Sequence, residues 1–202
     1  MKSPKILALP ALALLALTGC SSSNQAENKP MESVSPIQNQ ATQAATENLN
    51  ERGNIEASIG EEIVISGLAD NSEVYKFKVT GIELDVQCTE PYSQPAENGH
   101  FIKVNLEVNT GSKEAFDENY YHSLYTDGSS FKYIDNNGTT FGGSIYTGPT
   151  YGCIAESAKF PYELGPAEKA AGSIILDVPN LNGVIVYEDP QSQGGAEYQI
   201  SA

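Results

Sequence analysis

The residues best suited to chemistry lie in one segment of the chain, Phe116–Cys153. Six tyrosines fall in this segment: Tyr120, Tyr121, Tyr125, Tyr133, Tyr146 and Tyr151. Its second half is also rich in glycine. Tyrosine combined with glycine, serine and asparagine is typical of recognition loops, because it joins rigid amphipathic area to adaptable hydrogen bonds. We therefore take Tyr120, Tyr121, Tyr125, Tyr146 and Tyr151 as candidate binding residues. The alternative is that these tyrosines cover sheet faces and hairpin ends.

Catalytic residues are not marked out in the same way. Nucleophilic hydrolysis needs a base within reach of a serine or cysteine. Neither His100 nor His122 adjoins a nucleophile motif, and the chain has no nucleophile elbow. Paired carboxylates can hydrolyse glycosides, but no pair stands out among the 26 acidic residues. The sequence therefore predicts no enzyme activity and no cofactor.

One short run could bind a metal ion. The run Asp135-Asn136-Asn137-Gly138-Thr139 resembles part of a calcium loop, with oxygen ligands and a glycine for the sharp turn. Asp135 and Asn137 would be the ligands. The run lacks the full spacing and the distal bidentate glutamate of such a loop, and Asx-Gly runs are also common turns. Apart from this weak calcium candidate, we expect no metal site.

The amino-terminal residues have the layout of a secretory signal. Lys2 and Lys5 precede an apolar run that is too short to span a bilayer. The run closes on Leu17-Thr18-Gly19-Cys20, which resembles the lipobox of bacterial lipoproteins. In that family a diacylglycerol is added to the cysteine and the signal is cut before it. The resemblance implies a signal peptide over residues 1–19 and a lipidated Cys20. The alternative is an ordinary signal peptide whose cleavage site adjoins a cysteine.

If Cys20 is lipidated, Cys88 and Cys153 remain as the one other pair of cysteines. The environment outside the membrane is oxidising, and two leftover thiols there usually pair. We therefore predict a Cys88–Cys153 disulfide, worth roughly 4 kcal/mol in the chain-entropy model. A metal pair or two buried thiols are the alternatives. Neither cysteine is surrounded by a ligand-spaced cluster.

A polar segment separates Cys20 from the first predicted strand. It consists mostly of Ser, Asn, Gln, Ala, Thr and Glu, and its apolar residues are isolated. Such a segment cannot bury enough apolar surface to offset the entropy of ordering. We predict that residues 20–54 form a disordered tether that begins at the lipidated cysteine. A flexible tether of this length reaches roughly 30–35 Å.

The chain is strongly acidic. Its formal net charge is −15, and loss of Lys2 and Lys5 with the signal would leave −17. Such a chain is repelled by nucleic acid and by anionic headgroups, so we expect no nucleic-acid partner. The acidity has two explanations: it favours solubility, or it attracts a cationic partner or a divalent ion.

The remaining residues, 55–202, show the patterning of strands. Ile102, Val104, Leu106 and Val108 alternate with polar residues, which predicts a half-buried antiparallel strand. Further strands are predicted over Gly172–Pro179 and Val184–Tyr187, and a short edge strand over Tyr198–Ile200. Regularly spaced short strands separated by Gly, Pro and Asn turns predict an all-β fold, an antiparallel β-sandwich.

Two local features of these strands can be predicted. Tyr75–Val79 and Ile82–Cys88 follow opposite alternating registers, which a β-bulge at Gly81 would reconcile. Cys88 would then face the core and suit a bridge between the two sheets. The runs on either side of Asp127-Gly128 predict a hairpin.

Three stretches together resemble a known domain: FIKVNLEVNTG, YTDGSSFKY and LGPAEKAAGSIILDVP. They are similar to the immunoglobulin-like domain of the immunoprotective extracellular protein superfamily, which comprises secreted actinobacterial antigens and lipoproteins. The resemblance covers about Gly60–Tyr187. It departs from the family at Gly165-Pro166, where the family usually has Pro-Gly. The resemblance implies a small extracytoplasmic immunoglobulin-like β-sandwich without established catalysis, and it supplies no functional residues.

These observations favour a monomeric lipoprotein on the extracytoplasmic face of the cell membrane, acting as a non-catalytic binding or structural module of the envelope. Its partners would be the membrane, through the lipid, and an envelope protein or glycan. A solute-binding or sensing lipoprotein that presents a small ligand is one alternative, and an envelope hydrolase is another. A large apolar pocket would favour the solute-binding lipoprotein. A cleft whose carboxylates have shifted pKa values would favour the hydrolase.

Overall fold

The computed structural model describes residues 49–189, 191 and 195–202. The predicted signal peptide, Cys20 and the tether up to residue 48 lie outside the described residues. The strands are β1 (Ile55–Glu56), β2 (Glu62–Ser66), β3 (Glu73–Glu83), β4 (His100–Thr110), β5 (Leu124–Tyr125), β6 (Phe131–Asp135), β7 (Glu163–Leu164), β8 (Lys169–Val178), β9 (Gly183–Glu188) and β10 (Gly195–Ile200). The helices are α1 (Lys113–Glu118) and α2 (Gly148–Tyr151), with 3-10 turns η1 (Gly128–Ser130) and η2 (Glu156–Ala158).

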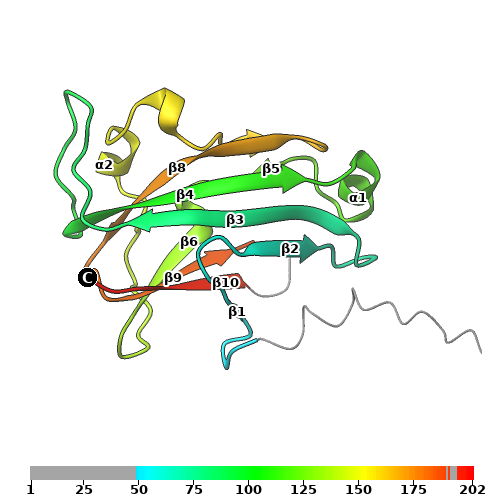
Figure 1. Cartoon of the computed structure of the whole chain (residues 1–202), viewed down its shortest axis with the longest axis horizontal. Coiled ribbons are helices and arrows are strands. Elements are labelled where there is room, and N and C mark those ends of the chain that lie inside the picture. The colour runs from blue at the N-terminus through cyan, green and yellow to red at the C-terminus, as the bar shows by residue number, and fades with distance from the viewer. Residues whose placement is uncertain (1–48, 190, 192–194) are drawn as a thin grey trace, which may run out of the picture. The chain divides into compact units, whose positions relative to one another are not determined.

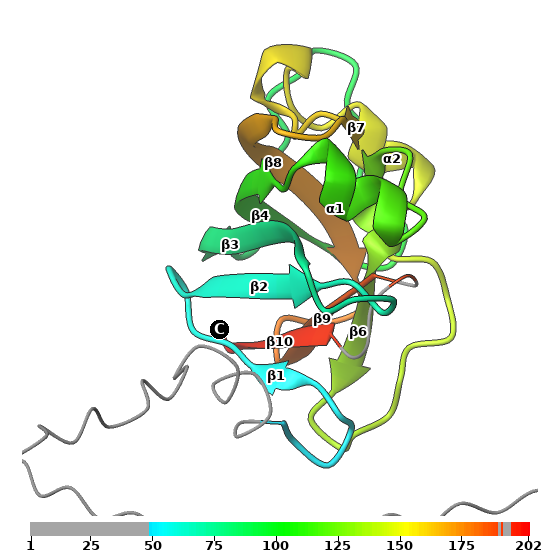
Figure 2. The ribbon, with the colours of Figure 1, turned by 90° about the vertical axis from the view of Figure 1, so that its right-hand side faces the viewer.

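The strands form two four-stranded sheets that pack face to face (Figures 1 and 2). One sheet has the order β2-β3-β4-β8, and the other has the order β1-β10-β9-β6. Neighbouring strands are antiparallel except for β1 and β10, which are parallel. A small separate ladder joins β5 to β7. The predicted all-β antiparallel β-sandwich is confirmed. Within the described residues, no helix is long and apolar enough to cross a membrane.

Side chains from both sheets fill the space between them. Val104 and Leu106 on β4 and Phe77 on β3 are buried, as the alternation predicts. Phe77 meets Tyr187 of the other sheet with ring centroids 4.4 Å apart. Burial of a large apolar side chain of this kind contributes about 1.5–3 kcal/mol, so this interior accounts for much of the stability of the sandwich.

The β-bulge predicted at Gly81 is present. Val79 pairs with Leu106 and Gly81 with Asn105, so the register between β3 and β4 shifts by one residue between Val79 and Gly81. Strand β3 then ends at Glu83, and Asp85 has a left-handed backbone conformation with φ of 51°. The predicted continuation of the strand to Cys88 is therefore wrong.

The predicted Cys88–Cys153 disulfide is present, but it does not join the two sheets. Cys153 packs with Phe101 and Ile175 in a small cluster apart from the main core. Alternation along β4 and β8 places Phe101 and Ile175 on the face that points away from the other sheet. The bond therefore fastens the β3–β4 connection and the segment after α2 to each other over the outer face of one sheet.

The hairpin predicted around Asp127-Gly128 does not form. Leu124 pairs with Leu164, and β6 pairs with β9. Asp127 instead caps the 3-10 turn η1, because its carboxylate accepts the Ser129 N–H at 2.7 Å. The predicted edge strand at Tyr198–Ile200 belongs to β10, which lies between β1 and β9.

Residues 49–54, which the sequence assigns to the tether, contact the sandwich. Leu49 bridges to Ile55, and the Arg52 guanidinium binds both oxygens of Glu197 on β10. The Asn54 amide donates to the same carboxylate at 2.7 Å. Glu197 is buried, and its hydrogen bonds, first that from Arg52, lower its pKa to about 2. This ion pair fixes the chain where it enters β1.

Candidate functional site

A cavity of about 370 Å³ opens beside the outer edge of β8. Its floor is Ser173–Ile175 of β8, and its walls come from η1, from α2 with the residues flanking it, and from residues 156–162. In Figure 2 the segment that carries α2 and η2, drawn in yellow, lies beside β8 at the top of the molecule. Residues far apart in the sequence therefore meet at this cavity.

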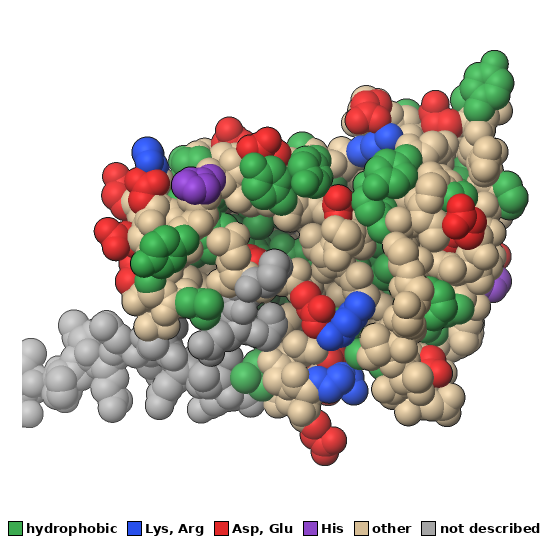
Figure 3. Space-filling view, turned by 180° about the vertical axis from the view of Figure 1, so that it is seen from behind, with side chains coloured by type: hydrophobic (Ala, Val, Ile, Leu, Met, Phe, Trp, Pro, Cys, Tyr) green, Lys and Arg blue, Asp and Glu red, His purple; other side chains and the backbone are tan. Residues whose placement is uncertain are grey.

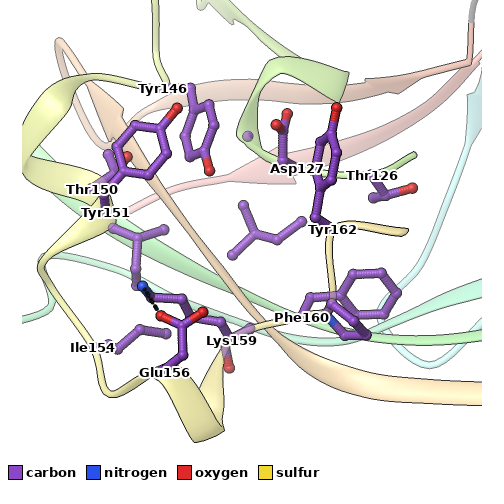
Figure 4. Close-up of a pocket in the computed structure, with 15 residues that line it drawn as sticks. Thr126, Asp127, Tyr146, Thr150, Tyr151, Ile154, Glu156, Lys159, Phe160 and Tyr162 are labelled. Atoms are coloured by element: carbon purple, nitrogen blue, oxygen red, sulfur yellow. Dashed lines mark hydrogen bonds and ion pairs between the residues drawn. The ribbon is translucent and has the colours of Figure 1, made fainter. Parts of the chain in front are cut away.

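Two pairs of tyrosines flank the cavity. Tyr146 and Tyr151 lie against each other with ring centroids 4.5 Å apart, and Tyr125 and Tyr162 do so at 5.3 Å. Figure 4 shows Tyr146 and Tyr151 on one side of the cavity and Tyr162 on the other. Tyr151 is 56% exposed and Tyr162 is 61% exposed. The cavity thus presents aromatic surface to a ligand from opposite sides.

Local sequence explains how Tyr146 and Tyr151 are held. Helix α2 begins two residues after Tyr146 and ends at Tyr151. Thr147 precedes the helix, and Pro149 occupies its first turn, where the missing N–H of proline costs nothing. The Thr150 hydroxyl donates to the Thr147 carbonyl at 2.7 Å. The Tyr146 ring rests against Gly128, where an added Cβ would lie 2.3 Å from a ring carbon. Burial raises the pKa of Tyr146, and its proximity to Tyr151 adds to this rise.

A buried carboxylate on β8 ties the walls of the cavity to its floor. Asp177 accepts the backbone N–H groups of Glu97 and Asn98 at 2.7 and 3.0 Å. It also accepts the Thr147 hydroxyl at 2.8 Å. One side chain therefore holds both the β3–β4 connection and the start of α2. The Cys88–Cys153 disulfide also joins the β3–β4 connection to the segment that follows α2.

The charged groups of the lining are few. The Lys159 ammonium binds Glu156 at 2.6 Å, as Figure 4 shows. Asp127 lies near Tyr162 in the same view and accepts the N–H and the hydroxyl of Ser129. Two carboxylates and one ammonium leave the lining with a net negative charge. Among the described residues, none of His100, His122, Cys88 and Cys153 lines the cavity.

Two smaller hollows adjoin the cavity. One, of about 270 Å³, shares Tyr151, Ile154, Glu156 and Lys159 with it and includes Tyr92, which is 96% exposed. The other, of about 190 Å³, lies on the far side of Tyr146 and Gly128. Hydrophobic side chains gather with acidic ones along the upper part of the face shown in Figure 3. Because each hollow shares lining residues with the cavity, the cavity is the middle of a longer, hollowed surface.

The structure separates the five candidate tyrosines. It brings Tyr146 and Tyr151 to the cavity, and Tyr125 reaches it through its contact with Tyr162. Tyr121 is only 2% exposed, and its hydroxyl donates to Asp189 at 2.7 Å. Tyr120 is 80% exposed but does not line the cavity.

Tyr121 belongs to a hydrogen-bonded group inside the sandwich. Tyr75 also donates to Asp189, at 2.7 Å, and its hydroxyl lies 3.0 Å from that of Tyr187. Burial raises the pKa of Tyr187 to about 12 and raises that of Tyr75 as well. For Tyr121 and Tyr133, which is also buried, covering the interior is thus the better explanation.

The remaining candidates are explained by local structure. Asp135 accepts the N–H groups of Asn137 and Thr139, both at 2.8 Å, and these bonds lower the pKa of Asp135. They form an Asx turn after β6. Among the described residues, no three acidic, histidine or cysteine side chains cluster to hold a metal ion. His100 lies on the surface with Nδ1 2.9 Å from Asp85, and His122 is exposed.

Sequence reasoning missed three contributors to the site. Tyr162 follows the segment singled out for its tyrosines, and Ile175 and Asp177 appear as ordinary members of a strand. For Asp177 a signal was available, since a carboxylate inside an apolar strand must find donors if it is buried. For Tyr162 and Ile175 the sequence carries no such signal, because the cavity depends on contacts between distant segments.

Comparison with known proteins shows no family for this chain. Neither a protein-family model nor a curated protein sequence matches the chain. Among solved structures, the chain is similar to MPT63, a secreted protein of Mycobacterium tuberculosis, with 14% identity and a TM-score of 0.46, covering 72% of this chain and 97% of that chain. It is also similar to an uncharacterized β-sandwich protein of Clostridium difficile, with 17% identity, a TM-score of 0.38, and coverage of 75% and 97%. Neither likeness carries an inference about the function of this chain.

Proposed function

We propose that this chain is a lipid-anchored, extracytoplasmic binding module of the cell envelope, without catalysis, and that the cavity beside β8 is its binding site. The observation that carries the proposal is the pair of tyrosine contacts that flank the cavity, Tyr146 with Tyr151 and Tyr125 with Tyr162. Exposed aromatic side chains beside a hollow are the usual anchors of recognition sites.

The way the site is built also supports binding. Asp177 and the disulfide hold the segments that carry Tyr146 and Tyr151, so the site is formed before a ligand arrives. A preformed site loses less conformational entropy on binding. The disulfide supports an oxidising compartment outside the cytoplasm.

The site is tested by replacing one exposed tyrosine. Tyr151→Ala removes aromatic contact area from the cavity, and we expect it to weaken binding of any ligand held there at least tenfold. The probes are peptidoglycan fragments and a library of short capped peptides, and the readout is calorimetry. Tyr120→Ala is the matched control, because Tyr120 is more exposed and lies outside the lining. Equal binding by both variants, with unchanged melting temperatures, would exclude the cavity as the site.

The lipid anchor is tested separately. Cys20→Ser removes the sulfur that the lipobox resemblance assigns to the diacylglycerol. We expect the protein to appear in the medium or to accumulate uncut, whereas the wild type partitions with membranes. Fractionation followed by mass measurement of the amino terminus distinguishes these outcomes. A mature Cys20→Ser protein that still sediments with membranes would contradict the anchor.

A second candidate function is the capture of a small solute for a membrane partner. The cavity volume of about 370 Å³ lies at the lower end of the range for small-molecule sites. Binding of small solutes in place of peptidoglycan fragments and peptides, with the same dependence on Tyr151, would favour this function.

A further inference from the structure

The outer edge of β8 is bonded to the rest of the protein at two places, with a gap between them. At one place the Ser173 carbonyl accepts the Phe160 N–H at 2.9 Å. At the other the Asp177 N–H donates to the Ile145 carbonyl at 2.8 Å, and the Asn98 amide donates to the Asp177 carbonyl. Ser173 and Asp177 are four residues apart, which is about 13 Å along a strand.

Ile175 lies in the middle of this gap. In an antiparallel pair, the backbone groups of alternate residues point to opposite edges of the strand. The register between β8 and β4 runs without a shift, so Ile175 directs its N–H and C=O away from β4, as Ser173 and Asp177 do. Among the described residues, no hydrogen bond to either of these groups is found on that edge.

The edge of β8 that carries these two groups borders the cavity. Ile175 is 3% exposed and forms part of the cavity floor. A buried backbone donor or acceptor without a partner costs free energy comparable to a lost hydrogen bond. A ligand that supplies both partners recovers that cost, so the floor of the cavity favours one kind of ligand chemistry.

We propose that the ligand is an extended peptide, one residue of which pairs with Ile175 as in an antiparallel strand. This inference rests on the proposed function, since it assigns the ligand of the same cavity. An extended residue presents its own N–H and C=O on one side of its Cα, so it exchanges both hydrogen bonds with Ile175. A single trans amide, such as the acetamido group of an amino sugar, points its N–H and C=O in opposite directions and satisfies only one.

The surroundings of Ile175 restrict the peptide further. Phe160 and Ile145 occupy the edge on both sides, so the peptide pairs through one residue and its neighbours leave the plane of the sheet. They then contact the tyrosine pairs that flank the cavity. Because Asp127 leaves the lining with a net negative charge, a Lys or Arg beside the pairing residue fits best. Its cation would lie between a carboxylate and tyrosine faces.

The proposal is tested with an array of end-capped pentapeptides and the full-length protein. We expect binders rich in Lys or Arg whose binding depends on Tyr151. Each backbone nitrogen of the best binder is then methylated in turn. One position, the residue opposite Ile175, should lose about tenfold or more in affinity, because its donor is removed, while the others change little. A binder that tolerates methylation at every position would overturn strand pairing.

The matching change in the protein is Ile175→Pro, which removes the N–H. It removes no bond to β4, since this N–H points to the outer edge. We expect peptide binding to weaken about tenfold, whereas the control Ala171→Pro, which removes an outer-edge N–H of the same strand outside the cavity lining, should bind as the wild type does. Unchanged binding by a folded Ile175→Pro protein counts against the proposal. If that variant does not fold, the methylation scan decides alone.

Oligomers of N-acetylglucosamine form a second arm of the experiment. If they bind with dependence on Tyr151 and the peptides do not, the cavity remains a binding site and the peptide proposal is overturned. If neither arm gives binding that depends on Tyr151, the proposed function itself fails, and this inference falls with it.

Discussion

At the scale of single residues, Gly128 controls the position of a binding side chain. Its Cα approaches the Tyr146 ring so closely that a Cβ would lie 2.3 Å from Cδ2 and 2.6 Å from Cγ. Both distances are far inside van der Waals contact, so the ring must move if a methyl group is added. Tyr146 separates the main cavity from the hollow beside Phe131, so moving the ring changes the shape of both.

We therefore predict that Gly128→Ala weakens ligand binding at least tenfold while lowering the free energy of unfolding by only about 1–3 kcal/mol, as overpacking commonly does. Gly142→Ala is the matched control, because a Cβ at Gly142 would meet nothing within 4 Å. Calorimetry and thermal melting measure the two effects separately. Wild-type affinity in Gly128→Ala would show that the position of Tyr146 is immaterial to binding.

At the scale of the elements, Asp177 connects strand β8 to the β3–β4 connection and to the start of α2. Its buried carboxylate accepts donors from the β3–β4 connection and from the residue that precedes α2. A buried donor that loses its partner costs about 1–3 kcal/mol. Asp177 thus stabilises the cavity wall through groups that belong to neither sheet.

Asp177→Ala should therefore lower the free energy of unfolding by about 3–5 kcal/mol and release the wall of the cavity. Hydrogen exchange at the Glu97 and Asn98 amides is the specific measurement, since both would lose protection. Asp117→Ala is the control, because Asp117 is exposed and pairs with Lys113 on α1, away from the cavity. Intact protection of the two amides in Asp177→Ala would mean that other contacts hold the connection.

The strands show which parts of the fold a sequence can predict. Val104 and Leu106 alternate with polar residues because one face of β4 is buried, and local pattern is enough to find such a strand. The bulge at Gly81 is predictable for the same reason, since a change of register leaves a visible break in the alternation. The run toward Cys88 keeps an alternating pattern after the strand has ended, because Val86 and Cys88 pack on the smaller outer cluster.

Pairing between distant elements is what the sequence does not reveal. The residues beside Asp127-Gly128 have strand-like composition, yet β5 pairs with β7 some 40 residues later. The same holds for the site. Tyr146 and Tyr151 stand out by composition, whereas the floor at Ile175 becomes a site only because Phe160 and Ile145 leave a gap on the edge of β8.

At the scale of the whole molecule, one ion pair joins the two ends of the described chain. Glu197 lies on the last strand, β10, and binds Arg52 and Asn54, which come just before the first strand, β1. Its pKa in the folded protein is about 2, against an ordinary value of 4.5. Because the folded pKa is the lower one, the unfolded chain binds the proton more tightly. The stabilisation is thus fully present above about pH 4.5 and is lost as the pH falls toward 2.

We predict that acidification from about pH 5 to pH 2 removes about 2 kcal/mol through this group, a figure reduced because Arg52 is half exposed to solvent. Glu197→Gln should be less stable at neutral pH and should show a shallower dependence of melting temperature on pH in this window. Glu107→Gln serves as the control, since the Glu107 side chain is exposed. Parallel curves of melting temperature against pH for the wild type and Glu197→Gln would exclude this ion pair as a source of acid sensitivity.

The short parallel strand β1 has a mechanical consequence. A molecule held by a lipid at Cys20, as we propose, receives any pulling force at its amino-terminal end. That force acts first on the ion pair at Arg52 and on β1, which pairs with β10 through only two residues. Detaching residues 49–56 would lengthen the tether by about 26–29 Å. The sheet β2-β3-β4-β8, which carries the floor of the cavity, does not include β1. Under load the module would therefore extend its reach before its binding site is disturbed.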